Sequence, residues 1–196
     1  LLNFKSPEAC DRLFEILNDR GKTLSDGDLL RSHTLELLER HTAFQQSVER
    51  YWDSILAGSQ TQIDQFLRSY YTAIVGSRAP RRDLFANFKK RFFEYRTPLR
   101  SRSPEIQDII RRIEEMHTEY GVYCKLTDTG DWPYDSSTCS VWENDRLFRL
   151  IGVLRHTLCI PLLLSAYHAF DESQFSQLIQ MLERLAFRYI TIVGAH

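Results

Sequence analysis

Helix-capping signals recur along this sequence, whereas the residues that break helices are scarce. The 196 residues include only 8 glycines and 6 prolines, too few for the many turns of a β-sandwich or barrel. Ser6-Pro7-Glu8 and Ser103-Pro104-Glu105 each place a serine N-cap, a proline at the first helical position and an acid in the first turn. Ser25 and Asp28 are spaced as a capping box. The sequence therefore predicts long helices.

Apolar residues recur at helical spacing between these caps. Two helices are expected to end near residues 20 and 41, and a long polar loop is expected over 127–140. The remaining expected helices cover about 44–56, 61–75, 81–96, 104–126, 142–157, 161–170 and 172–193. The most regular apolar stripe, expected to be buried, is Leu147, Leu150, Ile151, Leu154 and Leu158. We therefore expect an all-α fold, an irregular multi-helix bundle of about eight or nine helices.

Composition and charge exclude several classes of protein. The 25 basic and 26 acidic residues give a net charge of −1, which excludes a uniformly basic nucleic-acid coat protein. The 4 cysteines form no CxxC pair, so reduced thiols in a cytoplasmic protein are the expectation. No apolar run approaches the roughly 18–20 residues of a membrane span, so no membrane partner is expected. The chain starts at Leu1 without a methionine, and we expect it to be a segment of a longer protein.

The sequence carries no complete catalytic motif. It has no phosphate-binding glycine loop, no HExxH and no zinc-type Cys/His spacing, so we assign no catalytic residue, no metal ligand and no cofactor to this segment. One alternative is a HEPN-like ribonuclease, an all-helical enzyme with an R-x4-6-H pattern. Arg112 with His117, and Arg149 with His156, have such spacings.

Positive charge is concentrated between residues 78 and 102. That segment holds nine basic residues and two acids, so its charge is +7 and the rest of the chain is −8. Arg82, Lys89 and Arg96 are seven residues apart and are expected to follow one flank of a helix. One interpretation is a solvated face whose aromatic residues pack into the core. The other is a DNA-contacting edge formed by Arg82, Lys89, Lys90 and Arg96.

Residues 13–31 read LFEILNDRGKTLSDGDLLR and form the most informative stretch. A helix, a glycine stop and a capped helix start account for most of it. They do not account for Asn18, which lies at the edge of the apolar stripe, or for Arg20, whose guanidinium suits forked contacts with phosphate. Both residues are therefore candidates for a role beyond helix formation.

This stretch resembles the motif FExLNDRGKxLSxxDLLR of the GmrSD-type restriction endonucleases, in which it closes the N-terminal domain. Weaker similarities follow in the family's order: Trp52, 66–68, 84–89, 120–123, 161–163 and 182–188. Members carry a nucleotide-binding domain similar to ParB and sulfiredoxin with a DGQQR motif, then a helical region, then an HNH nuclease domain. This chain contains neither the DGQQR motif nor an HNH core.

The resemblance implies that residues 1–41 are the end of the nucleotide-binding domain and that 42–196 are the helical middle domain. It implies a cytoplasmic, nucleotide-dependent DNA endonuclease of bacterial anti-phage defence. The nucleoside triphosphate and a divalent metal would serve the full-length protein, with Asn18 and Arg20 as nucleotide-binding candidates. The segment itself would be non-catalytic, with DNA and the absent nucleotide-binding and nuclease domains as its partners. A stand-alone helical interaction module is a further alternative.

Overall fold

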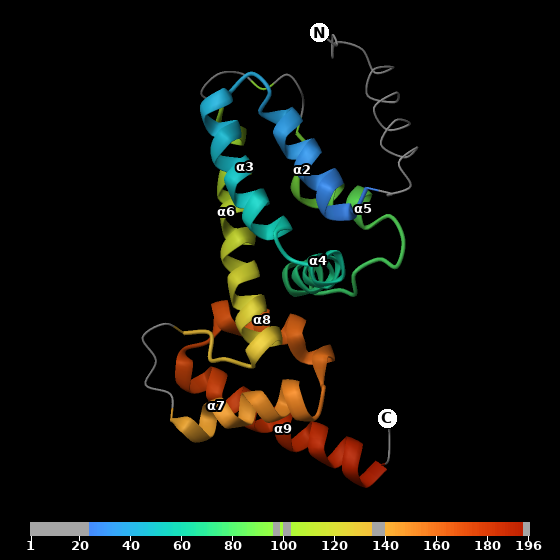
Figure 1. The fold of residues 1–196 in the computed structure, drawn as a ribbon, viewed down its shortest axis with the longest axis vertical. Helices are drawn as coiled ribbons and strands as arrows, with labels where there is room; N and C mark the ends of the chain where they lie inside the picture. The colour runs from blue at the N-terminus through green and yellow to red at the C-terminus, as the bar shows by residue number, and fades with distance from the viewer. Residues whose placement is uncertain (1–23, 96–98, 100–102, 135–139, 194–196) are drawn as a thin grey trace.

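The computed structural model describes residues 24–95, 99, 103–134 and 140–193, and all regular structure in this part is helical (Figure 1). The all-α fold is therefore confirmed. The eight described α-helices are α2 (Asp26–Leu37), α3 (Thr42–Leu56), α4 (Gln60–Val75), α5 (Leu84–Phe92), α6 (Pro104–Cys124), α7 (Val141–Phe148), α8 (Ile160–Ala169) and α9 (Glu172–Val193). Three shorter elements are π-helical η1 (Lys125–Thr129), π-helical η2 (Arg149–Val153) and 3-10 helical η3 (Thr157–Cys159).

The predicted caps begin their helices as expected. The Asp28 backbone N–H donates to Ser25 Oγ at 3.1 Å, and the Ser25 N–H donates back to the Asp28 carboxylate at 3.1 Å. Ser103 is the N-cap of α6 and Pro104 is its first residue. At the start of α9 the Gln174 N–H donates to Asp171 Oδ1 at 2.8 Å. The satisfied donors fix the starts of α2 and α9, whereas Ser103 makes no side-chain capping bond and the start of α6 is marked by Pro104.

The 21-residue helix α6 runs through the centre of the molecule, and the other helices are arranged along it (Figure 1). Helix α3 packs along the first part of α6, and α2 packs against both α3 and α5. Helix α8 joins the two ends of the molecule, because it packs against α4, α6 and α9. Helices α7 and α9 lie side by side at the far end of α6.

Buried aromatic rings hold these helices together. Trp52 of α3 is fully buried, and its Nε1–H donates to Thr34 Oγ1 of α2 at 2.8 Å. Phe66 of α4 packs against Tyr120 and Tyr123 of α6, with ring centroids 5.0 and 5.4 Å away. Each ring buries a large apolar area and makes a specific edge contact, so these pairs define how α4 crosses α6.

Two predicted helices are wrong in length. The helix expected over 81–96 covers only Leu84–Phe92, because Asp83 takes a left-handed φ of 56° and Phe93 ends the helix. The helix expected over 142–157 ends at Val153. The predicted loop over 127–140 is also partly helical, since η1 extends α6 to Thr129.

The early end of the 142–157 helix follows from η2. Its Leu154 N–H donates to the Arg149 carbonyl at 2.8 Å, an i→i+5 bond that places an additional residue in the turn. The chain then bends by 115° between the segment ending at Val153 and the segment beginning at Thr157. The predicted buried stripe is therefore confirmed for Leu147, Leu150 and Ile151. Leu154 is only partly buried, and Leu158 is 86% exposed.

No single described helix has both the length and the apolarity of a membrane span; only the two segments on either side of the 115° bend meet both criteria together. The two cysteines in the described part, Cys124 and Cys159, are both free.

Candidate nucleic-acid interface

Hydrogen bonds from α4 hold the loop between α4 and α5 in place. Gly76, with φ of 71°, ends α4 in the left-handed conformation that glycine tolerates best. The Ala79 N–H then donates to Thr72 Oγ1 at 3.1 Å, and Arg68 Nη1 donates to the Pro80 carbonyl at 2.7 Å. These bonds hold the loop against α4.

Helix α5 is fixed to α2 by its first turn. The Phe85 N–H donates to Asp26 Oδ1 at 3.1 Å, which satisfies one of the free N–H groups at the start of the helix. Asn87 Nδ2 donates to the Asp83 carbonyl at 2.8 Å. The buried face of α5 consists of Leu84, Phe88 and Phe92. The aromatic residues of this segment therefore belong to the core, and its cations are directed away from it.

We define the α5 basic cluster as the exposed cations of this loop and helix: Arg78, Arg81, Arg82, Lys89, Lys90 and Arg91. None of the six makes a hydrogen bond or an ion pair with another described residue. Two exposed acids, Asp83 and Glu94, lie in the same stretch of chain. The cluster therefore presents unneutralised positive charge on a backbone that its neighbours hold in place.

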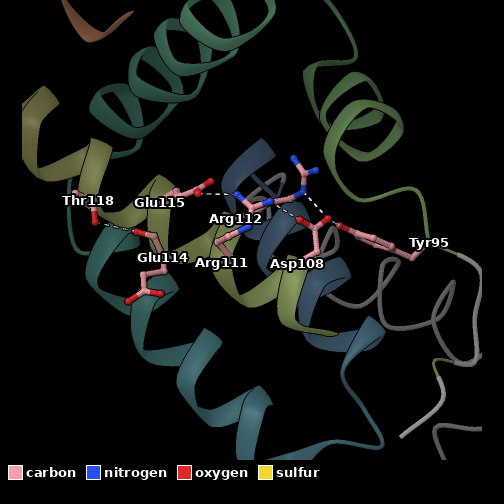
Figure 2. A network of polar contacts seen from close by, with 7 residues as sticks. All are labelled: Tyr95, Asp108, Arg111, Arg112, Glu114, Glu115 and Thr118. Atoms are coloured by element: carbon pink, nitrogen blue, oxygen red, sulfur yellow. Dashed lines mark hydrogen bonds and ion pairs between the residues drawn. The ribbon is translucent and has the colours of Figure 1, made fainter. Parts of the chain in front are cut away.

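The arginines of α6 differ from those of the cluster because they are neutralised within the protein (Figure 2). Arg112 Nε donates to Asp108 Oδ2 at 2.9 Å, and Arg111 bonds both Asp108 and Glu115. Tyr95 donates to the same Asp108 carboxylate at 2.5 Å. Burial favours a raised pKa for Asp108, but the bonds from Tyr95 and the two arginines outweigh it and lower the pKa to about 2. These charges tie Tyr95 to α6 and are not available to a ligand.

The arginines and histidines of the ribonuclease alternative make their observed contacts with other residues. Arg112 is bound to Asp108, whereas His117 Nε2 lies 3.0 Å from Ser54 Oγ and its ring packs against Tyr51. The second pair, Arg149 and His156, also makes contacts with other residues. Arg149 Nε donates to Glu183 Oε1 at 2.6 Å, and the backbone N–H of His156 donates to the carbonyl of Leu150 within η2. The geometry of neither pair favours a ribonuclease.

The structure places three of the six predicted site residues. Arg82 lies in the loop before α5 rather than on the helix, so it does not share a helical flank with Lys89 as predicted. Lys89 and Lys90 are exposed on α5. Asn18, Arg20 and Arg96 lie outside the described residues. The ring of His33 packs edge-on against Phe85 of α5, with the ring centroids 6.2 Å apart. Burial lowers the pKa of His33 and the Lys89 charge adds to this effect, whereas the contact with the Phe93 carbonyl opposes it.

A polar hollow of about 670 Å³ opens between α4, the end of α6 and the start of α8. Its lining includes Arg68, whose guanidinium also donates to the loop between α4 and α5. It also includes Asp128, which accepts two bonds from Gln62 Nε2 at 3.0 and 3.1 Å. The remaining lining is mostly hydroxyl-bearing. Within the described ranges, no group of three or more His, Cys, Asp or Glu side chains is arranged to hold a metal ion.

One buried acid was not identified from the sequence. Glu119 of α6 is only 5% exposed, and its Oε2 has no hydrogen-bond partner among the described residues. Its Oε1 contacts Nε2 of His168 on α8. Burial, with a contribution from Glu115, raises the pKa of Glu119 to about 7. This burial is hard to predict from the sequence, because Glu119 lies at the margin of the apolar stripe of α6, on the flank that α8 covers.

Neither a family model nor a curated protein matches this sequence.

Proposed function

We propose that this chain is the helical, DNA-contacting region of a nucleotide-dependent restriction endonuclease of the GmrSD type, and that it couples a nucleotide-binding domain to an HNH nuclease domain. The observation that supports this proposal best is the α5 basic cluster. The motif at residues 13–31 supports the family assignment. The cluster supports the contact with DNA.

The cluster has the properties that phosphate contacts require. Its six cations are exposed and have no ionic partner within the described part, so binding DNA breaks no ion pair with any described residue. Clustered Lys and Arg release condensed counterions when they neutralise phosphates, which gives affinity without reading bases. The anchored loop and helix limit the conformational entropy lost when phosphate binds.

The test is the salt dependence of binding to a duplex of about 30 base pairs, measured by fluorescence anisotropy between about 50 and 200 mM NaCl. Replacing Lys89 and Lys90 together by Gln is expected to lower the slope of log K against log salt by about 1.8, at roughly 0.9 per phosphate contact. The matched control replaces Arg40 and Arg50, two exposed cations elsewhere on the surface. A slope that falls equally in both double variants would leave only a net-charge effect and would refute the interface.

The coupling role is tested in the full-length protein. Asn18→Ala and Arg20→Ala are expected to weaken nucleotide binding or nucleotide-stimulated cleavage while leaving the melting of the 196-residue chain nearly unchanged. The comparison variant is Gly21→Val, which places a β-branched residue where the motif predicts a left-handed turn and should destabilise the chain. If all three variants lower the melting temperature alike, the role of Asn18 and Arg20 is structural.

A further inference from the structure

An apolar groove of about 380 Å³ runs between η2 and α9, at the opposite end of α6 from α2 and α3. We call it the α9 groove. Its lining is Arg149, Val153, Leu154, Glu183, Arg184 and Phe187. Two of its apolar lining residues are exposed to solvent: Val153 is 61% exposed and Phe187 is 54% exposed.

Polar contacts between neighbouring helices hold the groove open. Glu143 near the start of α7 accepts a hydrogen bond from Ser176 of α9, and further along Arg149 Nε donates to Glu183 Oε1 at 2.6 Å. The two helices therefore run parallel, with Val153 and Phe187 following on either side of the groove. The wall of the groove that contains Val153 ends where η2 ends. No residue in the described part of the chain covers Phe187 fully, since it is 54% exposed.

Positive charge surrounds this apolar surface. Arg146 Nε lies 3.8 Å from Glu183 Oε2, so Glu183 is shared between Arg146 and Arg149. With its amide oxygen directed at the guanidiniums, Gln180 accepts from Arg184 at 2.9 Å and from Arg146 at 3.1 Å. Three guanidiniums thus converge beside one carboxylate.

Two further arginines continue this charge along the chain. Arg155 and Arg188 are exposed and follow closely after the two walls, and neither pairs with a described acid. Segments 146–155 and 183–188 together contain five arginines and one acid. The arginines in these two segments therefore outnumber the acids by four, an excess of positive charge that the carboxylates of a short acidic peptide would neutralise.

We propose that the α9 groove docks a partner protein through an acidic amphipathic segment. An aliphatic or aromatic side chain of that segment would enter between Val153 and Phe187, and its carboxylates would pair with Arg184 and Arg188. Aromatic residues and arginines without lysine are the composition of protein–protein interface cores. Guanidinium groups bind carboxylates through two parallel hydrogen bonds, which fixes the register of the peptide.

The chemistry of the groove favours a peptide over nucleic acid. Around the α5 basic cluster Phe88 and Phe92 are buried, and the solvent-facing charge is mainly positive, as suits a phosphate backbone. In the α9 groove the exposed surface is apolar at its centre and charged at its rim, which a sugar–phosphate backbone would leave unfilled. The area around Phe187 is therefore a distinct surface with a distinct partner.

The experiment selects ligands for the 196-residue chain from an unbiased phage library of peptides about a dozen residues long, followed by anisotropy with the synthetic peptides. The expected consensus is a large apolar residue flanked by Asp or Glu. Phe187→Ala should weaken binding of the selected peptides at least tenfold. Arg184→Gln should weaken it severalfold and reduce its salt dependence. The control is Leu185→Ala, since Leu185 is 62% exposed on α9 but does not line the groove.

Four outcomes would overturn the proposal. One is a library that yields no binder, or binders with a basic or neutral consensus. Another is binding that Phe187→Ala and Leu185→Ala weaken equally, because the groove would then not be the site. The third is a chain that self-associates in sedimentation and loses this association with Phe187→Ala, because the occupant would then be a second copy. An oligothymidylate that displaces the peptide with equal affinity would likewise assign the groove to nucleic acid.

Discussion

The buried carboxyl of Glu119 predicts that the protein loses stability as the pH rises through neutrality. In the folded chain its pKa is about 7, against 4.5 when it is solvated. The folded state therefore holds this proton to higher pH than the unfolded state does. Its stabilising effect is complete below about pH 4.5 and is lost as the pH rises towards and past 7.

The size of the effect follows from linkage. One pKa unit corresponds to about 1.36 kcal/mol, so this group lowers the free energy of unfolding by about 2–3 kcal/mol between pH 5 and pH 8. His168 works in the opposite direction when protonated, because an imidazolium favours the ionised carboxylate. Its side chain keeps 53% of its surface exposed, so solvent screens that charge. Burial of Glu119 is therefore expected to decide the sign.

Glu119→Gln isolates this contribution, because glutamine keeps the shape of the side chain without its titration. The free energy of unfolding is measured with urea at several pH values from 5 to 8. The variant should match the wild type at pH 5 and exceed it by about 2 kcal/mol at pH 8. Glu114→Gln is the control, because Glu114 is exposed on the same helix and does not contribute to the raised pKa of Glu119. A wild type and a Glu119→Gln variant with parallel pH profiles would refute the reasoning.

Three further predictions concern backbone and charge. Gly121→Ala should raise the free energy of unfolding by about 0.5–1 kcal/mol in urea titrations, because Gly121 is an exposed helical residue with open space around a new Cβ; a destabilised variant would contradict this. Arg155 has φ of 51°, so Arg155→Gly should be at least about 1 kcal/mol more stable than Arg155→Val in the same assay. Lys89→Gln should raise the pKa of His33, followed by NMR of its ring protons, and an unchanged pKa would show that Lys89 does not reach this ring.

The sequence was most informative where a structural signal is local. Capping depends on a few neighbouring residues, so Ser25 with Asp28, Ser103 with Pro104, and Gly76 each predicted a helix end that the structure confirms. The apolar periodicity over 142–157 misled because it is equally compatible with one straight helix and with a π-turn followed by a bend. Only the packing of η2 against α9 and η1 distinguishes the two.

The candidate sites divide in the same way. The α5 basic cluster could be predicted because its cations are close in sequence, although Arg82 was expected on the helix rather than in the loop before it. The charge of the α9 groove could not be predicted, since Arg146 and Arg184 are far apart in the sequence and meet only through the parallel packing of α7 and α9. The burial of Glu119 depends on α8 covering one flank of α6, which periodicity does not encode.

Helix α4 has a consequence for how two bound molecules would be arranged. Its carbonyl at Ala73 accepts from Ser165 of α8 at 2.9 Å, one residue after Thr72, which anchors the basic loop. Helix α8 in turn packs against α9. Two binding partners would thus be separated by stacked helices instead of a flexible tether. The chain would act as a spacer of fixed length and hold two bound partners at a defined separation, so the partners could meet only if their sizes bridge that separation.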